Sequence, residues 1–304
     1  MFKAKRLISI DDLDQEDVME LYQVTKKFKS INEQAIRKTS FLKDFTVANL
    51  FFEDSTRTRV SFELAEKRLS ADSISFSTGT SSVKKGETLN DTVRNLVSMK
   101  IDLIVIRHNI SGAAHFVSNH TGLPVINAGD GTNEHPTQAL LDLFTLYDQG
   151  LENKDIRICL MGDILHSRVA GSSIKLWQKL GIQFEIYSPK TAQRNLSGAR
   201  FMKTRNLAGF NILYNLRIQK ERQNVELIPG EMEYQKYFGT KEQDLKPNQF
   251  IMHPGPINRG VELDSGSADS PNSLILEQVN TGVSLRMAVL YLLAQKKGPV
   301  EPLL

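Results

Sequence analysis

Residues 55–59 read S-T-R-T-R and combine three hydroxyls with two guanidiniums. The β-branched, apolar run at 46–52 comes before them and is typical of a buried strand. A segment without Gly or Pro follows and is typical of a helix. A helix that begins here would direct unpaired backbone N–H groups and its positive dipole end outward. The motif is therefore a candidate cradle for a phosphate or another dianion, although a helix capped by Ser55 or Thr56 with solvated arginines explains it as well.

The helix expected after this motif has an amphipathic pattern. Its apolar residues stand among charged residues that we expect to face solvent. The apolar set is Val60, Phe62, Leu64 and Leu69, and the charged set is Glu63, Glu66, Lys67 and Arg68. Arg59 is expected to be structural and to pair with an acid such as Glu53 or Glu63.

Polar and cationic residues also follow five further predicted strands. They are Arg107 after 102–106, His135 and Gln138 after 123–128, Arg168 after 156–161, Arg217 and Gln219 after 211–215, and Gly255 and Pro256 after 249–252. In parallel α/β sheets, ligands bind beyond the carboxyl ends of the strands. The clustering therefore predicts one shared site for anionic ligands.

Each of these residues also has a purely structural interpretation. His135 can bond backbone at a helix start, and Arg168 and Arg217 can be solvated arginines. Lys84 and Lys85 in the polar loop 79–86 can be surface charge. The Gly255-Pro256 pair can simply shape a turn.

Composition excludes several classes of protein. The 304 residues carry a net charge of +3 without a block of like charges, so no nucleic-acid partner is expected. The one cysteine, Cys159, lies in an apolar run and is expected to be buried, and the histidines lack metal-ligand spacing. Neither a Walker phosphate loop nor a dinucleotide fingerprint occurs. Without a signal-peptide pattern or an apolar run of membrane length, a cytoplasmic protein with no membrane contact is expected.

Strands and helices alternate along the chain, which predicts an α/β fold with two domains, each a mainly parallel sheet flanked by helices. Strands are expected at 46–52, 73–77, 102–106, 123–128, 156–161, 184–187, 211–215 and 249–252. Helices are expected at 14–29, 88–99, 137–147, 169–180 and 284–295, one that begins after Ser55 or Thr56, and another that ends at His120. We expect one domain from 1–148 plus 285–304 and the other from 149–284. The basic, weakly periodic stretch 190–205 has no predicted element.

Taken together and in order, these motifs resemble the catalytic chains of the aspartate carbamoyltransferase family. The motifs are F-F-E-D-S-T-R-T-R-x-S-F-E, K-K-G-E-T, R-H, H-P-T-Q-x-L-L-D, L-R-I-Q-K-E-R and H-P-G-P-x-N-R-G, and they cover nearly the whole chain. H-P-G-P stands where ornithine carbamoyltransferases typically carry H-C-L-P. The resemblance therefore favours aspartate over ornithine as the amine substrate.

The resemblance implies a role for each candidate residue. In the first domain, Ser55, Thr56, Arg57 and Thr58 would hold the phosphate of carbamoyl phosphate, and Arg107, His135 and Gln138 would hold its carbamoyl group. The carbonyls of Gly255 and Pro256 would contact the carbamoyl amide. In the second domain, Arg168 and Arg217 would bind the aspartate carboxylates together with Lys85, and Gln219 would lie nearby. Arg57, Thr58, Lys85, Arg107 and His135 would be the catalytic residues.

The implied reaction transfers the carbamoyl group from carbamoyl phosphate to L-aspartate in pyrimidine biosynthesis, without a metal or cofactor. Another amine such as ornithine, or a non-catalytic anion-binding relative, is the alternative. The resemblance also implies a homotrimer in which Ser81 and Lys85 act in the neighbouring subunit's site. Association with regulatory chains or a dihydroorotase is left open.

Overall fold

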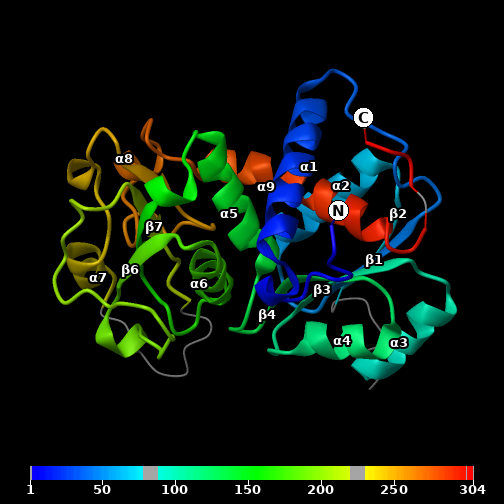
Figure 1. Cartoon of the computed structure of the whole chain (residues 1–304). Coiled ribbons are helices and arrows are strands. Elements are labelled where there is room, and N and C mark those ends of the chain that lie inside the picture. Colours follow the sequence, from blue (N-terminus) through cyan, green and yellow to red (C-terminus); the bar gives the residue numbers. More distant parts are fainter. Residues whose placement is uncertain (1, 78–87, 220–229, 299, 304) are drawn as a thin grey trace. The chain divides into compact units, whose positions relative to one another are not determined.

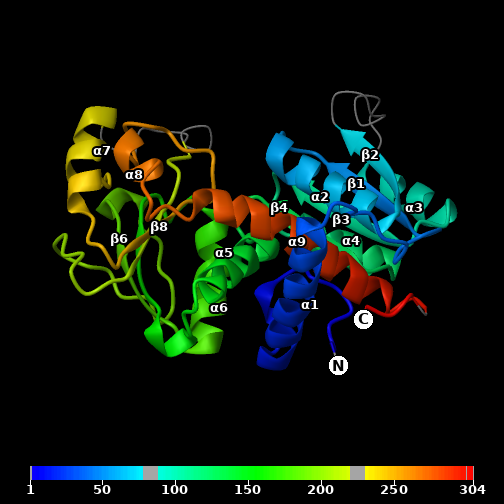
Figure 2. The same cartoon turned by 90° about the horizontal axis from the view of Figure 1, so that it is seen from above.

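The computed structural model describes residues 2–77, 88–219, 230–298 and 300–303. Its contacts divide into two compact units, residues 1–141 with 280–304 and residues 142–279. Figure 1 shows the elements of both units, and Figure 2 shows them from above. Each unit contains a four-stranded parallel sheet with flanking helices, which confirms the predicted α/β class.

The sheet of the first unit has the strand order β2-β1-β3-β4. Its strands are β1 (Thr46–Phe51), β2 (Asp72–Ser77), β3 (Leu103–His108) and β4 (Val125–Asp130). The helices are α1 (Gln15–Glu33), α2 (Thr56–Leu69), α3 (Leu89–Ser98) and α4 (Ala113–Thr121). In addition, α5 (Pro136–Asp148) begins in this unit and α9 (Ile275–Ala294) ends in it. All four strands overlap the predicted ranges; β1, β3 and β4 are largely buried, whereas most of β2 is exposed.

Helices cover both faces of this sheet, which explains why β1 and β3 are mostly apolar. Side chains of β1 and β3 pack on one face against α3 and α4 in a fully buried cluster that includes Leu50, Val93, Ile104 and Val117. Helices α2 and α9 lie on the other face (Figure 1). There the Arg286 guanidinium of α9 stacks over the Phe62 ring of α2, 5.0 Å from its centroid.

The sheet of the second unit has the order β6-β5-β7-β8. Its strands are β5 (Arg157–Met161), β6 (Gln183–Tyr187), β7 (Ile212–Asn215) and β8 (Phe250–Met252), and its helices are α6 (Arg168–Leu180), α7 (Glu231–Tyr237) and α8 (Ser265–Ala268). On one face, the α6 residue Trp177 packs against Phe184 and Tyr214, with ring centroids 5.4 and 6.0 Å apart.

The other face of this sheet is covered by irregular chain. Cys159 lies there in a cluster with Met161, Leu207 and Leu213. As expected, Cys159 is buried, and burial raises the pKa of its thiol to about 12, which disfavours the thiolate that a nucleophile needs. The unassigned stretch 190–205 contains one short 3-10 helix, η4 (Lys190–Ala192), and then pairs through Phe201 with Ile186 at the edge of β6.

Three helices differ from the sequence prediction. Helices α7 and α8 were not expected, because each is too short to show a hydrophobic period. Helix α9 was expected at 284–295 but begins at Ile275. Its first residues include the exposed Leu276 and Val279, so the apolar pattern there does not mark a buried face.

Among the described residues, no helix is both long enough and apolar enough to cross a membrane. Among the same residues, no three His, Cys, Asp or Glu side chains gather as a metal site would require. The cytoplasmic location and the lack of a nucleic-acid partner stay predictions of the sequence.

Candidate active site

In the first unit, the strand order reverses direction between β1 and β3. The chain passes from β1 through α2 to β2 on one side, and later places β3 on the other side of β1. Such a switch point opens a crevice beyond the carboxyl ends of its two strands. Phe51 of β1 is in register with Arg107 of β3, and the Phe52 N–H donates to the Arg107 carbonyl at 2.9 Å. The S-T-R-T motif and Arg107 therefore both lie at this edge.

The Arg107 side chain is fixed by three neighbours from different elements. Its Nη1 donates to the Ala128 carbonyl of β4 at 3.2 Å and lies 3.5 Å from Thr58 Oγ1. Its Nη2 pairs with Glu53 Oε1 at 3.3 Å. The Arg107 side chain is only 13% exposed. A fixed, largely desolvated guanidinium is a stronger electrostatic partner for an anion than a solvated one, because its orientation is already set.

Helix α2 begins at Thr56, directly beyond β1, with Ser55 at the N-cap position. Ser55 occupies the N-cap position, as the sequence suggested, but its side chain makes no capping hydrogen bond. Thr56 and Arg57 are exposed, and Ser55 and Thr58 are half-buried. An exposed helix N-terminus surrounded by hydroxyls and a guanidinium can bind a phosphate. Arg59 instead lies along the helix, with Nε 3.9 Å from Glu63 Oε1, as the sequence suggested.

The loop between β4 and α5 positions His135 and Gln138. Its centre is Asp130, whose carboxylate accepts N–H groups from Gly112 at 2.7 Å and Glu134 at 3.1 Å. Gly131 has φ +49°, and a Cβ there would lie 2.6 Å from the Ser111 nitrogen, so only glycine fits. His135 is 5% exposed and Gln138 is half-buried at the start of α5.

The second unit has its own switch point, between β5 and β7. The Leu216 N–H donates to the Met161 carbonyl at 2.7 Å, so the two strand ends lie against each other. Gly162 follows Met161 with φ +121°, and a Cβ on it would lie 2.8 Å from the Leu216 carbonyl oxygen. A glycine is therefore required where the segments that follow β5 and β7 separate.

The candidate residues Arg168, Arg217 and Gln219 lie on the segments that leave these two strands. Arg168 is the first residue of α6 and is 4% exposed, whereas Arg217 and Gln219 are half-buried. The carboxylate of Asp163 joins the two segments, because it accepts the Gln219 N–H at 3.4 Å and lies 3.0 Å from His166 Nδ1.

Gly255 and Pro256 lie just beyond β8, on a loop in the second unit. Gly255 has φ +66° and precedes a cis peptide bond to Pro256. Gly255 is half-buried and Pro256 is exposed. Arg259, farther along the same motif, makes a two-pronged ion pair with Asp269 at 2.7 Å and is structural. Ser81 and Lys85, proposed from the resemblance to act in trans, lie outside the described residues.

The structure adds three charged residues that sequence reasoning did not place at these sites. Glu53 pairs with Arg107, and Asp163 joins the β5 and β7 segments. The Arg194 side chain is half-buried, and burial lowers its pKa while the charge of Asp163 opposes that shift. Arg194 lies in the stretch without a predicted element, which reaches the site because Ile164 and Leu165 donate to the Ala192 carbonyl.

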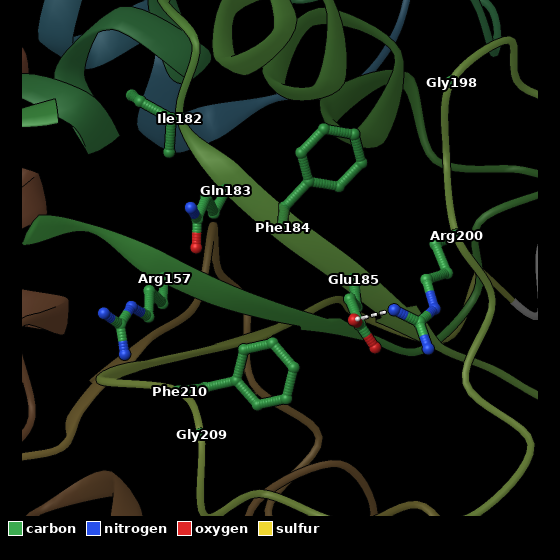
Figure 3. A pocket seen from close by; sticks show the side chains of 9 residues that line it. All are labelled: Arg157, Ile182, Gln183, Phe184, Glu185, Gly198, Arg200, Gly209 and Phe210. Carbon is green, nitrogen blue, oxygen red and sulfur yellow. Dashed lines mark ion pairs between the residues drawn. The ribbon is translucent and has the colours of Figure 1, made fainter. Parts of the chain in front are cut away.

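A separate hollow of about 560 Å³ occurs in the second unit. Nine residues line it: Arg157, Ile182, Gln183, Phe184, Glu185, Gly198, Arg200, Gly209 and Phe210. Its cation Arg200 pairs with Glu185 at 3.2 Å, as Figure 3 shows. Arg157 and Gln183 are the first residues of β5 and β6, so this hollow lies at the amino ends of the strands, away from the candidate residues.

These features define the class of protein, a two-unit α/β enzyme that carries cationic groups at the switch points of both sheets. The model of the aspartate/ornithine carbamoyltransferase carbamoyl-P binding domain matches residues 5–148. The model of the aspartate/ornithine carbamoyltransferase Asp/Orn binding domain matches residues 154–293. The chain belongs to the aspartate/ornithine carbamoyltransferase family.

Two similar proteins carry the name of the aspartate branch of this family. A protein of Cytophaga hutchinsonii named aspartate carbamoyltransferase catalytic subunit is 49% identical over 97% of this chain and 98% of its own length. One of the same name from Campylobacter fetus is 47% identical over 97% and 98%. These similarities confirm the resemblance found in the motifs.

Solved structures agree with this assignment. Aspartate transcarbamoylase from Trypanosoma cruzi, in complex with carbamoyl phosphate and aspartate, has a TM-score of 0.85 and 28% identity, covering 95% of this chain and 97% of that one. The catalytic subunit of M. jannaschii aspartate transcarbamoylase has a TM-score of 0.82 and 33% identity, covering 96% and 98%.

Proposed function

We propose that this chain transfers the carbamoyl group of carbamoyl phosphate to L-aspartate, giving N-carbamoyl-L-aspartate and phosphate in pyrimidine biosynthesis. The observation that carries the proposal is the 44–49% identity, over at least 95% of the chain, to eight proteins named aspartate carbamoyltransferase catalytic subunit. The ligands of the T. cruzi structure, carbamoyl phosphate and aspartate, are the two substrates of this reaction.

The first unit is the proposed binding site for carbamoyl phosphate. The hydroxyls of Ser55, Thr56 and Thr58, the Arg57 guanidinium and the N–H groups of α2 would hold the phosphate. Support comes from the position of the motif at the start of α2, where the Ser55 side chain makes no capping bond. The phosphate gains negative charge as it departs, and these donors would accommodate that charge.

Arg107 and His135 are the proposed donors to the carbonyl oxygen, together with Thr58. The aspartate amine attacks the carbonyl carbon and forms a C–N bond, and the carbonyl oxygen becomes an oxyanion. Collapse of this intermediate breaks the bond to phosphate, which leaves with the electron pair and accepts the amine proton. Fixed donors stabilise the oxyanion without reorganising, and the hydrogen bonds of Arg107 to its neighbours support such a role. Gln138, Gly255 and Pro256 would hold the amide end of the carbamoyl group.

Aspartate would be bound in the second unit by Arg168 and Arg217, with Gln219 nearby. Guanidiniums suit this task because they bind carboxylates through two parallel hydrogen bonds. Lys85 of a neighbouring chain would complete this set. Holding two anionic substrates in reactive orientation supplies much of the rate, so no cofactor is proposed.

An amine panel tests the proposed reaction. The purified chain is incubated with carbamoyl phosphate and aspartate, ornithine or other amino acids, and phosphate and carbamoylated product are measured. We expect one phosphate for each N-carbamoyl-L-aspartate, and the highest kcat/KM with aspartate. Faster turnover with ornithine would assign the chain to the other branch of its family, and no turnover with any amine would favour a non-catalytic anion-binding protein.

We also propose that the chain forms a homotrimer in which Ser81 and Lys85 act in the neighbouring subunit's site. Arg57→Ala and Lys85→Ala chains should each be inactive. After denaturation and joint refolding in equal amounts, sites that combine a native Arg57 with a native Lys85 should restore about a quarter of the native activity. No recovery after subunit exchange has been verified would show that each chain supplies its own Lys85.

A further inference from the structure

Beyond β8, the loop 254–258 is held by a buried histidine–glutamate pair that the mechanism above does not use. The Gly255 N–H donates to His253 Nδ1 at 2.8 Å. On the other side of the ring, His253 Nε2 lies 3.3 Å from Glu262 Oε1. The same oxygen accepts the Asn258 N–H at 2.8 Å. The pair therefore bonds the loop at both ends.

These contacts specify which ring nitrogen of His253 carries the proton. Nδ1 accepts the Gly255 N–H, so it must be unprotonated, and the proton of the neutral ring must lie on Nε2. Nε2 then donates to Glu262. The carboxylate thus selects the tautomer that leaves Nδ1 free to accept from the loop.

The loop depends on this pair because it has few donors of its own. Pro254 and Pro256 have no N–H, which leaves those of Gly255, Ile257 and Asn258. Two of these three donate to His253 and Glu262. Removing the carboxylate would remove the hydrogen bond that orients the His253 ring and the acceptor of the Asn258 N–H.

The burial of Glu262 indicates that its carboxylate has a specific role. The His253 and Glu262 side chains are 0% and 2% exposed. Glu262 Oε2 is buried and has no hydrogen-bond partner among the described residues. A buried carboxylate bonded through one oxygen costs free energy that an apolar residue would avoid. The cost is consistent with a residue kept for orientation.

The backbone of His253 is anchored by other residues of the second unit. The His253 N–H donates to Gln278 Oε1 at 3.0 Å, and Gln278 Nε2 donates to Asp142 Oδ1 at 2.6 Å. Asp142 also accepts the Tyr214 hydroxyl from β7. The backbone of His253 is therefore held independently of its side chain, and the loop beyond it is what the pair can orient.

We propose that Glu262 is a positioning residue for carbamoyl transfer, which acts through His253 to aim the carbonyl oxygens of Gly255 and Pro256 at the carbamoyl amide. This inference rests on the proposed function, because it assigns the loop to that amide. It predicts a selective defect. Ligands that carry the amide should lose affinity, and ligands that carry only the phosphate should not.

The test compares two ligands on two variants. Phosphonoacetamide carries both a phosphonate and an amide, whereas inorganic phosphate lacks the amide. Glu262→Met removes the acceptor, and we expect about tenfold weaker phosphonoacetamide binding with unchanged phosphate binding. Glu262→Gln keeps an oxygen acceptor for His253 and Asn258 and should restore most of that affinity. Calorimetric titration measures both ligands, and kcat with aspartate should fall in parallel for Glu262→Met.

His253→Gln provides a second route if Glu262→Met does not fold. This variant keeps an amide donor for Glu262 but leaves no acceptor at the ring position of Nδ1 that Gly255 uses, so it should show the same loss for phosphonoacetamide alone. Equal losses for both ligands, or no loss in either folded variant, would overturn the positioning role. Ligand binding separates this result from the proposed function, because a native chain that binds both ligands but transfers nothing would refute only the reaction.

Discussion

An Arg107→Ala variant is expected to transfer carbamoyl groups about 10²–10³-fold more slowly than the native chain, which is the usual effect of removing one oxyanion donor. Arg107 supplies a full positive charge, and its side chain is held by Ala128, Thr58 and Glu53. The loss should appear mainly in kcat, because the negative charge on the oxygen develops only after the substrates are bound, as the amine attacks. Steady-state kinetics with both substrates would measure it.

The matched control is Arg59→Ala, which removes a guanidinium from the same motif region. Arg59 is 41% exposed and lies near Glu63 on the helix, so its loss should change kcat by no more than a few-fold. Arg107→Ala also leaves the Glu53 carboxylate without this cation, and a thermal unfolding curve must show that the variant is folded. An Arg107→Ala chain that is folded and retains native kcat would refute the oxyanion role.

The fold was largely predictable because each sheet leaves a strong local signal. Runs such as L-I-V-I at 103–106 are apolar at every position, as expected for strands that are covered on both faces. The structure places that run in β3, between β1 and β4. The same logic located the candidate residues, because the first polar residue after an apolar strand marks the strand's carboxyl end. The two switch points could not be predicted in this way, because they depend on the order of the strands in each sheet, and local sequence patterns do not contain that order.

Pairings between distant residues could not be predicted in the same way. Arg107 and Glu53 are 54 positions apart, and Arg107 could have paired with any nearby acid. His253 and Glu262 are close in sequence, and the prolines and glycines between them indicate a turn, but they do not specify which side chains the turn brings together. The role of Glu262 becomes visible only when the Asn258 and Gly255 donors are located.

Helix α2 shows how an amphipathic pattern can mislead. Val60 and Leu64 were expected to be buried but are 49% and 37% exposed, whereas Glu66 was expected to face solvent and is 0% exposed. Position 66 lies four residues after Phe62 and three before Leu69, so it shares the buried face with both. The charge of Glu66 suggested that it is exposed, but its position on the helix places it on the buried face.

The buried Glu66 carboxyl leads to a prediction about stability and pH. Burial raises the pKa of Glu66 from 4.5 to about 7, although its hydrogen bonds from Ser73 and Asn49 oppose the shift. The folded chain thus retains a proton that the unfolded chain releases above about pH 4.5. Stability from this group is therefore present at low pH, falls as pH rises from about 4.5 to 7, and stays reduced above pH 7.

A Glu66→Gln variant should remove this pH-dependent penalty, because its side chain stays neutral and its oxygen can still accept from Asn49 and Ser73. We expect a gain of up to about 3 kcal/mol in unfolding free energy at pH 8, and little change at pH 5. Urea unfolding at both pH values would measure the difference.

Glu63→Gln, three residues earlier and 29% exposed, is the control and should show no such gain. Since unfolding is compared within each pH, general effects of pH on the chain cancel. Equal effects of Glu66→Gln at pH 5 and pH 8 would mean that Glu66 is ionised in the folded chain at both values, and that Asn49 and Ser73 stabilise its charge despite burial.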